Sequence, residues 1–176
     1  MLLIGVGSKS AFSELYKRYH KKLHFYFCKS LQYDSPKAED MLHDLFMKLM
    51  EKPEQFNHSR KFSTWVYQVA TNMCRNEWRN QNNRSSILQH QASTAAAVSA
   101  VSLNEKLDRA FFRERLQQVY AELKEEERLI FVLRFHHELA IKEISDITGT
   151  PEGTTKSRIF YMLKKLASQL KTFDPK

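Results

Sequence analysis

Three residues of the types that bind zinc, His20, His24 and Cys28, follow one another at four-residue steps. On a helix this spacing places all three side chains on one face, as a metal site requires. The surrounding segment YHKKLHFYFC supplies no nearby carboxylate to act as a base, and a small rotation moves the three side chains to the margin of a core. We therefore interpret them as core-margin residues and expect neither a metal nor a cofactor, with a metalloprotein as the open alternative.

A second candidate for chemistry is the carboxylate pair Asp40 and Asp44, which a metal-dependent nuclease or another hydrolase could use. Such a site also needs His, Lys or further acids around the pair, and the sequence offers none at an interpretable spacing. Because Asp residues four positions apart are common on exposed helices, we expect no catalysis.

The strongest binding motif lies in the segment LAIKEISDITGTPEGTTKSRIFYMLKKLASQL. Ile141, Ile144 and Ile147 predict a short apolar helix, and Gly149 permits a left-handed turn. Thr150 and Pro151 then begin a second helix. This order predicts a helix-turn-helix unit.

The second helix of this unit is amphipathic. Its predicted buried side consists of Thr155, Ile159, Met162, Leu163, Leu166 and Leu170. Its predicted free side consists of Thr154, Ser157, Arg158, Tyr161, Lys164 and Lys165. Basic and hydroxyl side chains near a helix N-terminus can enter the major groove and contact phosphates and base edges. We expect this helix to bind DNA.

A helix predicted over residues 62–80 has another candidate DNA-binding face. Its buried side is expected to hold Phe62, Trp65, Val66, Val69 and Met73. The opposite side is expected to hold Thr64, Tyr67, Gln68, Thr71, Arg75, Trp78 and Arg79. Aromatic and Arg planes stack on unpaired bases, and Arg also neutralises phosphate. This face suits single-stranded or distorted nucleic acid.

Two further helices are predicted before this one, over residues 11–31 and between Pro36 and Pro53. In the second of them, Ala38, Met41, Leu42, Leu45 and Leu49 share one side. The opposite side carries Asp40, His43, Asp44 and Met47, with Glu39 and Phe46 at its margins. Periodicity alone predicts a solvated acidic face there.

Composition limits the fold to helical classes. The 176 residues include only 4 Gly and 4 Pro, too few for a β-barrel or a phosphate-binding loop. A formal charge of +8 favours an acidic partner. Cys28 and Cys74 form no CxxC pair, so we expect reduced thiols. No segment approaches the ~20 apolar residues of a membrane helix, and the apolar start lacks the basic residues of a secretion signal. We therefore expect a cytoplasmic protein.

The predicted domain organisation is an all-α chain of two small helical domains, 1–80 and 105–176, joined by a flexible linker at 81–104. The linker region, RNQNNRSSILQHQASTAAAVSAVSLN, is rich in Asn, Gln, Ser and Ala and has no sustained apolar period. A packed Ala-rich helix near 92–101 is the alternative. A helix from about Asn104 to Leu123 and another opening at the acidic LKEEERL should complete the second domain.

Two ordered groups of motifs resemble one family. AEDMLHDLFMKL and FSTWVYQVATN in the first half, followed by LKEEERLIFVLRF and IKEISDITGTPEGTTKSRI in the second, are similar to the extracytoplasmic-function (ECF) sigma factors of bacterial RNA polymerase. The resemblance spans about 10–79 and 105–170. This chain departs from the usual family residues at His43, commonly Gln, at Asn76, often an acid, and at Tyr161, commonly Arg.

The resemblance implies a role for each surface. The clamp helices of the largest polymerase subunit would bind Asp40, His43, Asp44, Phe46 and Met47. The promoter −10 element would be opened and read by Lys61, Thr64, Gln68, Thr71, Asn72, Arg75, Trp78 and Arg79. The −35 duplex would be read by Thr154, Thr155, Lys156, Ser157, Arg158, Phe160, Tyr161 and Lys164. Further partners implied are the polymerase flap and an anti-sigma factor.

The main alternative is a stand-alone helix-turn-helix regulator whose first domain senses a ligand or forms a dimer. Such a sensing domain would not require the outward Trp, Tyr, Thr and Arg side chains of the 62–80 helix. Tight promoter binding by the free protein would favour the regulator.

Overall fold

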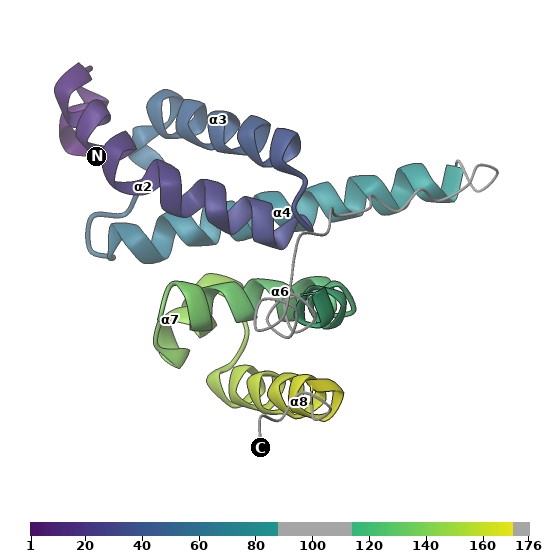
Figure 1. Ribbon diagram of the computed structural model, residues 1–176. Helices are drawn as coiled ribbons and strands as arrows, with labels where there is room; N and C mark the ends of the chain where they lie inside the picture. Colours follow the sequence, from purple (N-terminus) through teal and green to yellow (C-terminus); the bar gives the residue numbers. More distant parts are fainter. Residues whose placement is uncertain (88–113, 171–176) are drawn as a thin grey trace, which may run out of the picture.

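The computed structural model describes residues 1–87 and 114–170, and throughout these residues the secondary structure is helical (Figure 1). The predicted all-α fold is confirmed. The first domain consists of α1 (Leu2–Gly5), α2 (Lys9–Ser30), α3 (Ser35–Glu51), the 3₁₀ turn η1 (Pro53–Gln55) and α4 (Phe62–Ile87). A helical stretch at 114–121 precedes α6 (Glu125–Phe131), the π-helical turn η2 (Val132–His136), α7 (Ile141–Thr148) and α8 (Glu152–Leu170).

Side-chain caps fix where the first long helices begin. The Ser8 hydroxyl accepts a hydrogen bond from the Ala11 N–H at 3.3 Å, and α2 starts at the next residue. The Asp34 carboxylate accepts from the Lys37 N–H at 3.0 Å, and Pro36 occupies the first turn of α3. Each cap satisfies a backbone donor that has no partner inside the helix.

The first-domain core lies where α2, α3 and α4 meet. Leu23, Tyr26 and Phe27 of α2 are fully buried, as is Leu45 of α3. Val66 of α4 closes the same cluster. The apolar side predicted for residues 36–53 is therefore the core side of α3, as its three- and four-residue spacing requires.

α4 differs from its prediction in length and in orientation. It continues to Ile87, past the expected boundary at 80. Residues 88–113, which include most of the predicted linker, the alternative Ala-rich helix and the expected helix start at Asn104, lie outside the described residues. Tyr67, Thr71 and Trp78, all expected to be exposed, are buried, whereas Trp65 and Met73 are only half-buried.

The helix-turn-helix prediction is confirmed in the second domain. α7 ends at Gly149, whose φ of 65° is left-handed, and α8 starts directly after Pro151. Glu125, Glu126 and Glu127 occupy the first turn of α6, where acids favour the helix dipole. Within the described residues, no helix combines the length and apolarity needed to cross a bilayer.

The two domains pack against each other along α4 (Figure 1). The Tyr67 hydroxyl lies 3.1 Å from Nδ1 of His137, and the ring of Phe25 meets the ring of His136 edge-on at 4.9 Å. The Tyr120 hydroxyl donates to the Lys29 carbonyl at 3.2 Å. The second domain thus packs against α4 and against the C-terminal half of α2.

The buried hydroxyl pair Tyr26 and Thr71 provides a test of this core. Their oxygens lie 2.8 Å apart and both side chains are fully buried. Tyr26→Phe leaves the Thr71 hydroxyl without this partner, so the free energy of unfolding in urea should fall by about 1–3 kcal/mol. Adding Thr71→Val should recover part of the loss, because two apolar groups need no partner. An unchanged stability in Tyr26→Phe would contradict the assignment.

The lowered pKa of His137 predicts that the stability of the fold depends on pH. Burial, followed by the charges of His136 and Lys22, lowers the pKa of His137 from 6.5 to about 4. The folded state therefore favours neutral His137, and its contribution to stability is present above pH 6.5 and lost as the pH falls toward 4. We expect the wild-type urea midpoint to fall more steeply over this range than that of His137→Gln. Parallel curves would contradict this expectation.

Candidate functional site

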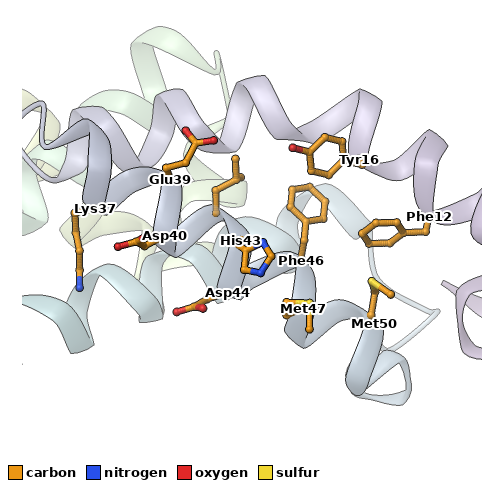
Figure 2. A pocket seen from close by; sticks show the side chains of 11 residues that line it. Phe12, Tyr16, Lys37, Glu39, Asp40, His43, Asp44, Phe46, Met47 and Met50 are labelled. Atoms are coloured by element: carbon orange, nitrogen blue, oxygen red, sulfur yellow. The ribbon is translucent and has the colours of Figure 1, made fainter.

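A hollow of about 730 Å³ lies on the outer side of α3 (Figure 2). Asp40, His43 and Asp44 line its rim, and all three are exposed. Met47 and Met50, 42% and 48% exposed, continue the lining toward the end of the helix. The residues predicted to form an outward acidic face on α3 therefore lie together in one concave surface.

Aromatic side chains from α2 form the floor of the hollow. Figure 2 shows Phe12 and Tyr16 directed toward Phe46. The Phe46 ring centroid lies 6.0 Å from that of Phe12, edge-on, and 4.8 Å from that of Tyr16. Phe46 is only 4% exposed, so its expected place at the margin of the acidic face is wrong and it supports the floor. The helical spacing of Phe12 and Tyr16 indicates an apolar side of α2 but does not reveal that this side borders a groove.

An apolar floor with an acidic rim suits a protein partner. An amphipathic helix can place an apolar face in such a groove while its basic residues meet the rim carboxylates. Met47 and Met50 add flexible, polarizable contact surface. The hollow is open and lies on one side of the domain, so a rigid partner element can reach it.

The residues considered for metal binding are arranged differently. His24 Nε2 lies 3.1 Å from a Glu39 carboxylate oxygen and 3.6 Å from Cys28 Sγ. His20 Nδ1 is 3.2 Å from the Tyr16 carbonyl, and the two rings stack. Within residues 1–87 and 114–170, no group of three or more His, Cys, Asp or Glu side chains could hold a metal ion. Burial raises the pKa of Cys28, and that of Cys74 to about 12, so both are thiols at neutral pH.

The predicted −10-binding face of α4 requires two kinds of correction. Thr71 belongs to the first-domain core, because its hydroxyl pairs with Tyr26. Trp78 is 5% exposed, and the guanidinium of Arg128 lies over its ring at 6.0 Å. Lys61, Asn72 and Arg79 are exposed as predicted. Thr64 and Gln68 are half-buried and line a second hollow, described next.

Charged residues of the two domains meet on this side of α4. Arg75 donates to both carboxylate oxygens of Glu126, at 2.7 and 2.9 Å, and to the Thr148 carbonyl at 2.9 Å. Lys61 Nζ lies 3.2 Å from Glu143 Oε1. A backbone hydrogen bond from Ala140 and then the one from Lys61 lower the pKa of Glu143. A second hollow, of about 500 Å³, is lined by Arg60, Lys61, Thr64, Trp65, Gln68, Lys142, Glu143 and Asp146.

The predicted −35-binding face of α8 is largely free. Exposed residues on it are Thr154, Lys156, Ser157, Phe160, Tyr161 and Lys164, and Arg158 is half-buried. Thr155 is fully buried and its hydroxyl lies 3.5 Å from the Thr150 carbonyl, so its assignment to DNA contact is wrong. Leu163, expected in the core, is 42% exposed and extends the apolar part of the free surface.

Comparison with known proteins gives the same two-part division. A family model of sigma-70 region 2 matches residues 15–84, and a model of sigma-70 region 4 matches residues 121–168. The ECF RNA polymerase sigma factor SigW of Bacillus subtilis is 26% identical over 172 residues, covering 94% of this chain and 91% of SigW. The ECF RNA polymerase sigma-E factor of Escherichia coli is 27% identical, with coverages of 88% and 83%.

Solved structures share the fold. The sigma factor RpoE of Bartonella quintana, solved with the anti-sigma factor NepR, matches with a TM-score of 0.70 and 20% identity, covering 92% of this chain and 97% of that one. CnrH, solved with the cytosolic domain of CnrY, matches with a TM-score of 0.67 and 18% identity, with coverages of 99% and 96%. With both sigma-70 regions matched in order, this chain belongs to the sigma-70 family, as a sigma factor of the extracytoplasmic-function group.

Proposed function

We propose that this sigma factor binds core RNA polymerase through the hollow on α3 and directs the enzyme to promoters by reading DNA with α4 and α8. The observation that carries the proposal is the hollow itself, in which Asp40, His43 and Asp44 surround an aromatic floor. The partner at this hollow is the clamp-helix pair of the largest polymerase subunit. The second domain adds a contact with the polymerase flap.

The charges of the three surfaces support the assignment of the hollow to polymerase and of the other two surfaces to DNA. The chain carries a formal charge of +8, yet the rim of the hollow is acidic. A nucleic acid would be repelled from such a rim, whereas a basic protein helix would be attracted to it. The two surfaces assigned to DNA, in contrast, contain Lys61 just before α4, Arg79 on α4, and Lys156 and Lys164 on α8.

DNA recognition follows from the exposed groups on each helix. At the −35 element, Lys156 and Arg158 contact phosphate or guanine edges, while the rings of Phe160 and Tyr161 contact apolar base edges in the major groove. At the −10 element, Asn72 and Gln68 supply hydrogen-bonding amides and Arg79 supplies a phosphate contact. Capturing an unstacked base there costs a few kcal/mol, which protein contacts offset.

In the proposed function, the polymerase catalyses RNA synthesis. We propose that the chain itself is not an enzyme and acts in the cytoplasm, where its two partners are. The RpoE and CnrH structures were solved with other protein chains bound, and RpoE's partner is an anti-sigma factor. By analogy, we propose an anti-sigma factor as a third partner of this chain.

Charge reversal in the hollow tests the polymerase contact. Asp44→Arg should weaken binding to core polymerase by about tenfold or more, because a close interfacial charge pair is worth over 1.4 kcal/mol. Binding is measured by titrating labelled protein with core enzyme. Glu51→Arg, on the same helix but outside the lining of the hollow, is the matched control. Equal affinities of the two variants would contradict this contact.

Salt dependence tests the −35 contact. Lys156→Ala should reduce the slope of log affinity against log salt by about 0.9 if the ammonium neutralises one phosphate. The slope is measured for the complex with core polymerase on a promoter duplex obtained by mapping transcription starts. Lys17→Ala on the exposed side of α2 should leave the slope unchanged. A slope that Lys156→Ala does not alter would remove Lys156 from the DNA contact.

Dependence on polymerase separates the proposal from a stand-alone regulator. Gel shifts with the same duplex should show specific binding only when core polymerase is present. Tight and specific binding by the free chain would favour the regulator.

A further inference from the structure

Two aromatic side chains lie side by side on the free surface of α8, which is assigned to the −35 element. Phe160 and Tyr161 are 62% and 66% exposed, so neither ring contributes much to the core of the second domain. Their centroids lie 5.4 Å apart, with an angle of 77° between the ring planes. Leu163, 42% exposed, continues the apolar surface along the helix. An apolar corner therefore projects into solvent within a polar surface, as is typical of a binding site.

Tyr161 lies between polar residues that face DNA in the proposed function. Ser157 precedes it by four residues and Lys164 follows it by three, so the three side chains share one face of α8. Ser157 and Lys164 are both exposed. A recognition helix presents one face to the floor of the major groove. Contacts with DNA on both sides of Tyr161 consequently place its ring against the edges of base pairs.

The polar side chains around Tyr161 have little capacity to distinguish bases. The Ser157 hydroxyl donates to the Gly153 carbonyl at 3.0 Å, so its proton is used within α8. Lys164 carries a compact charge on a flexible stem, which suits a phosphate. The Thr155 side chain is fully buried. Discrimination among bases at this turn of α8 therefore depends on the ring of Tyr161.

An aromatic ring and a guanidinium select different bases. An Arg, the common family residue at this position, can donate two parallel hydrogen bonds to O6 and N7 of guanine. The phenol of Tyr161 has a single hydroxyl and cannot reproduce that fork. Thymine presents an apolar group, its C5-methyl, in the major groove, and apolar side chains pack on this methyl. The corner between the rings of Phe160 and Tyr161 offers such a contact.

We propose that Tyr161 is a specificity-determining residue, which selects a thymine of the −35 element through the C5-methyl group, with Phe160 as the second wall of the contact. The inference rests on the proposed function and deepens it by naming the base that is read. A guanine at the same base pair is disfavoured, because its O6 and N7 would face a ring that cannot supply two donors.

Removal of single methyl groups from the DNA tests the proposal. Deoxyuridine lacks the C5-methyl of thymidine and keeps the same hydrogen-bonding groups. Each thymine of the −35 region, on either strand, is therefore replaced by deoxyuridine, one position at a time. The duplex is a promoter obtained by mapping transcription starts, and its affinity is measured for the complex of the full chain with core polymerase. We expect one substitution to weaken binding by about fourfold, the effect of one buried methyl group.

Variants of the exposed Tyr161 assign the effect to its ring. In Tyr161→Ala, the thymine and deoxyuridine duplexes should bind equally. Tyr161→Phe should keep the ratio of about fourfold, because the ring and not the hydroxyl contacts the methyl. Tyr161→Arg should prefer guanine to thymine at this base pair. Lys156→Ala, on the same helix, is the matched control: it should weaken binding to both duplexes and leave their ratio unchanged.

A −35 element without thymine would overturn the proposal, and so would ratios below about twofold at every position. A methyl effect that persists in Tyr161→Ala would also overturn it. These failures can be told apart from a failure of the proposed function. If Lys156→Ala reduces the salt slope while no methyl affects binding, the −35 contact is supported and the role of Tyr161 is wrong. A complex that responds neither to Lys156→Ala nor to any change in the −35 region contradicts both.

Discussion

The structure depends on α4 being packed on two opposite sides. One side carries Val66 and Ala70 into the core with α2 and α3, and the other carries Tyr67 and Arg75 into the second domain. A helix free on one side would need a narrower apolar stripe. The double packing explains why α4 has buried residues around much of its circumference.

The Arg75–Glu126 contact makes this arrangement specific as well as compact. The stabilisation from apolar packing is proportional to the buried area and has no direction, so it allows one helix to slide along another. A bidentate pair, in contrast, fixes one position of the two helices relative to each other. The side chains of Arg75 and Glu126 are each about one third exposed to solvent. Water therefore weakens the attraction between the two charges, and the net stabilisation of the fold is modest.

Much of the fold could be predicted from local sequence signals. Asp34 and Pro36 begin α3, Gly149 and Pro151 separate α7 from α8, and the acidic face of α3 follows from helical spacing.

The predicted exposure was wrong for residues that are buried by another part of the chain. Helical periodicity alone predicts that Tyr67 and Trp78 are exposed, and it cannot reveal that residues of the second domain cover them. Thr71 was misplaced because a hydroxyl is compatible with both an exposed face and a buried pair such as that with Tyr26. The π-helical turn η2, which brings His137 to Tyr67, has no comparable sequence signal.

The hollow on α3 and the candidate −10 residues of α4 differ in how they lie relative to the second domain. The hollow on α3 is lined only by residues of α2 and α3, and Figure 1 places α3 on the far side of the first domain from α6 to α8. A partner can therefore enter the hollow while Arg75 is still bound to Glu126. The candidate −10 residue Arg75, by contrast, is bonded to Glu126 of the second domain, so the two surfaces differ in their accessibility.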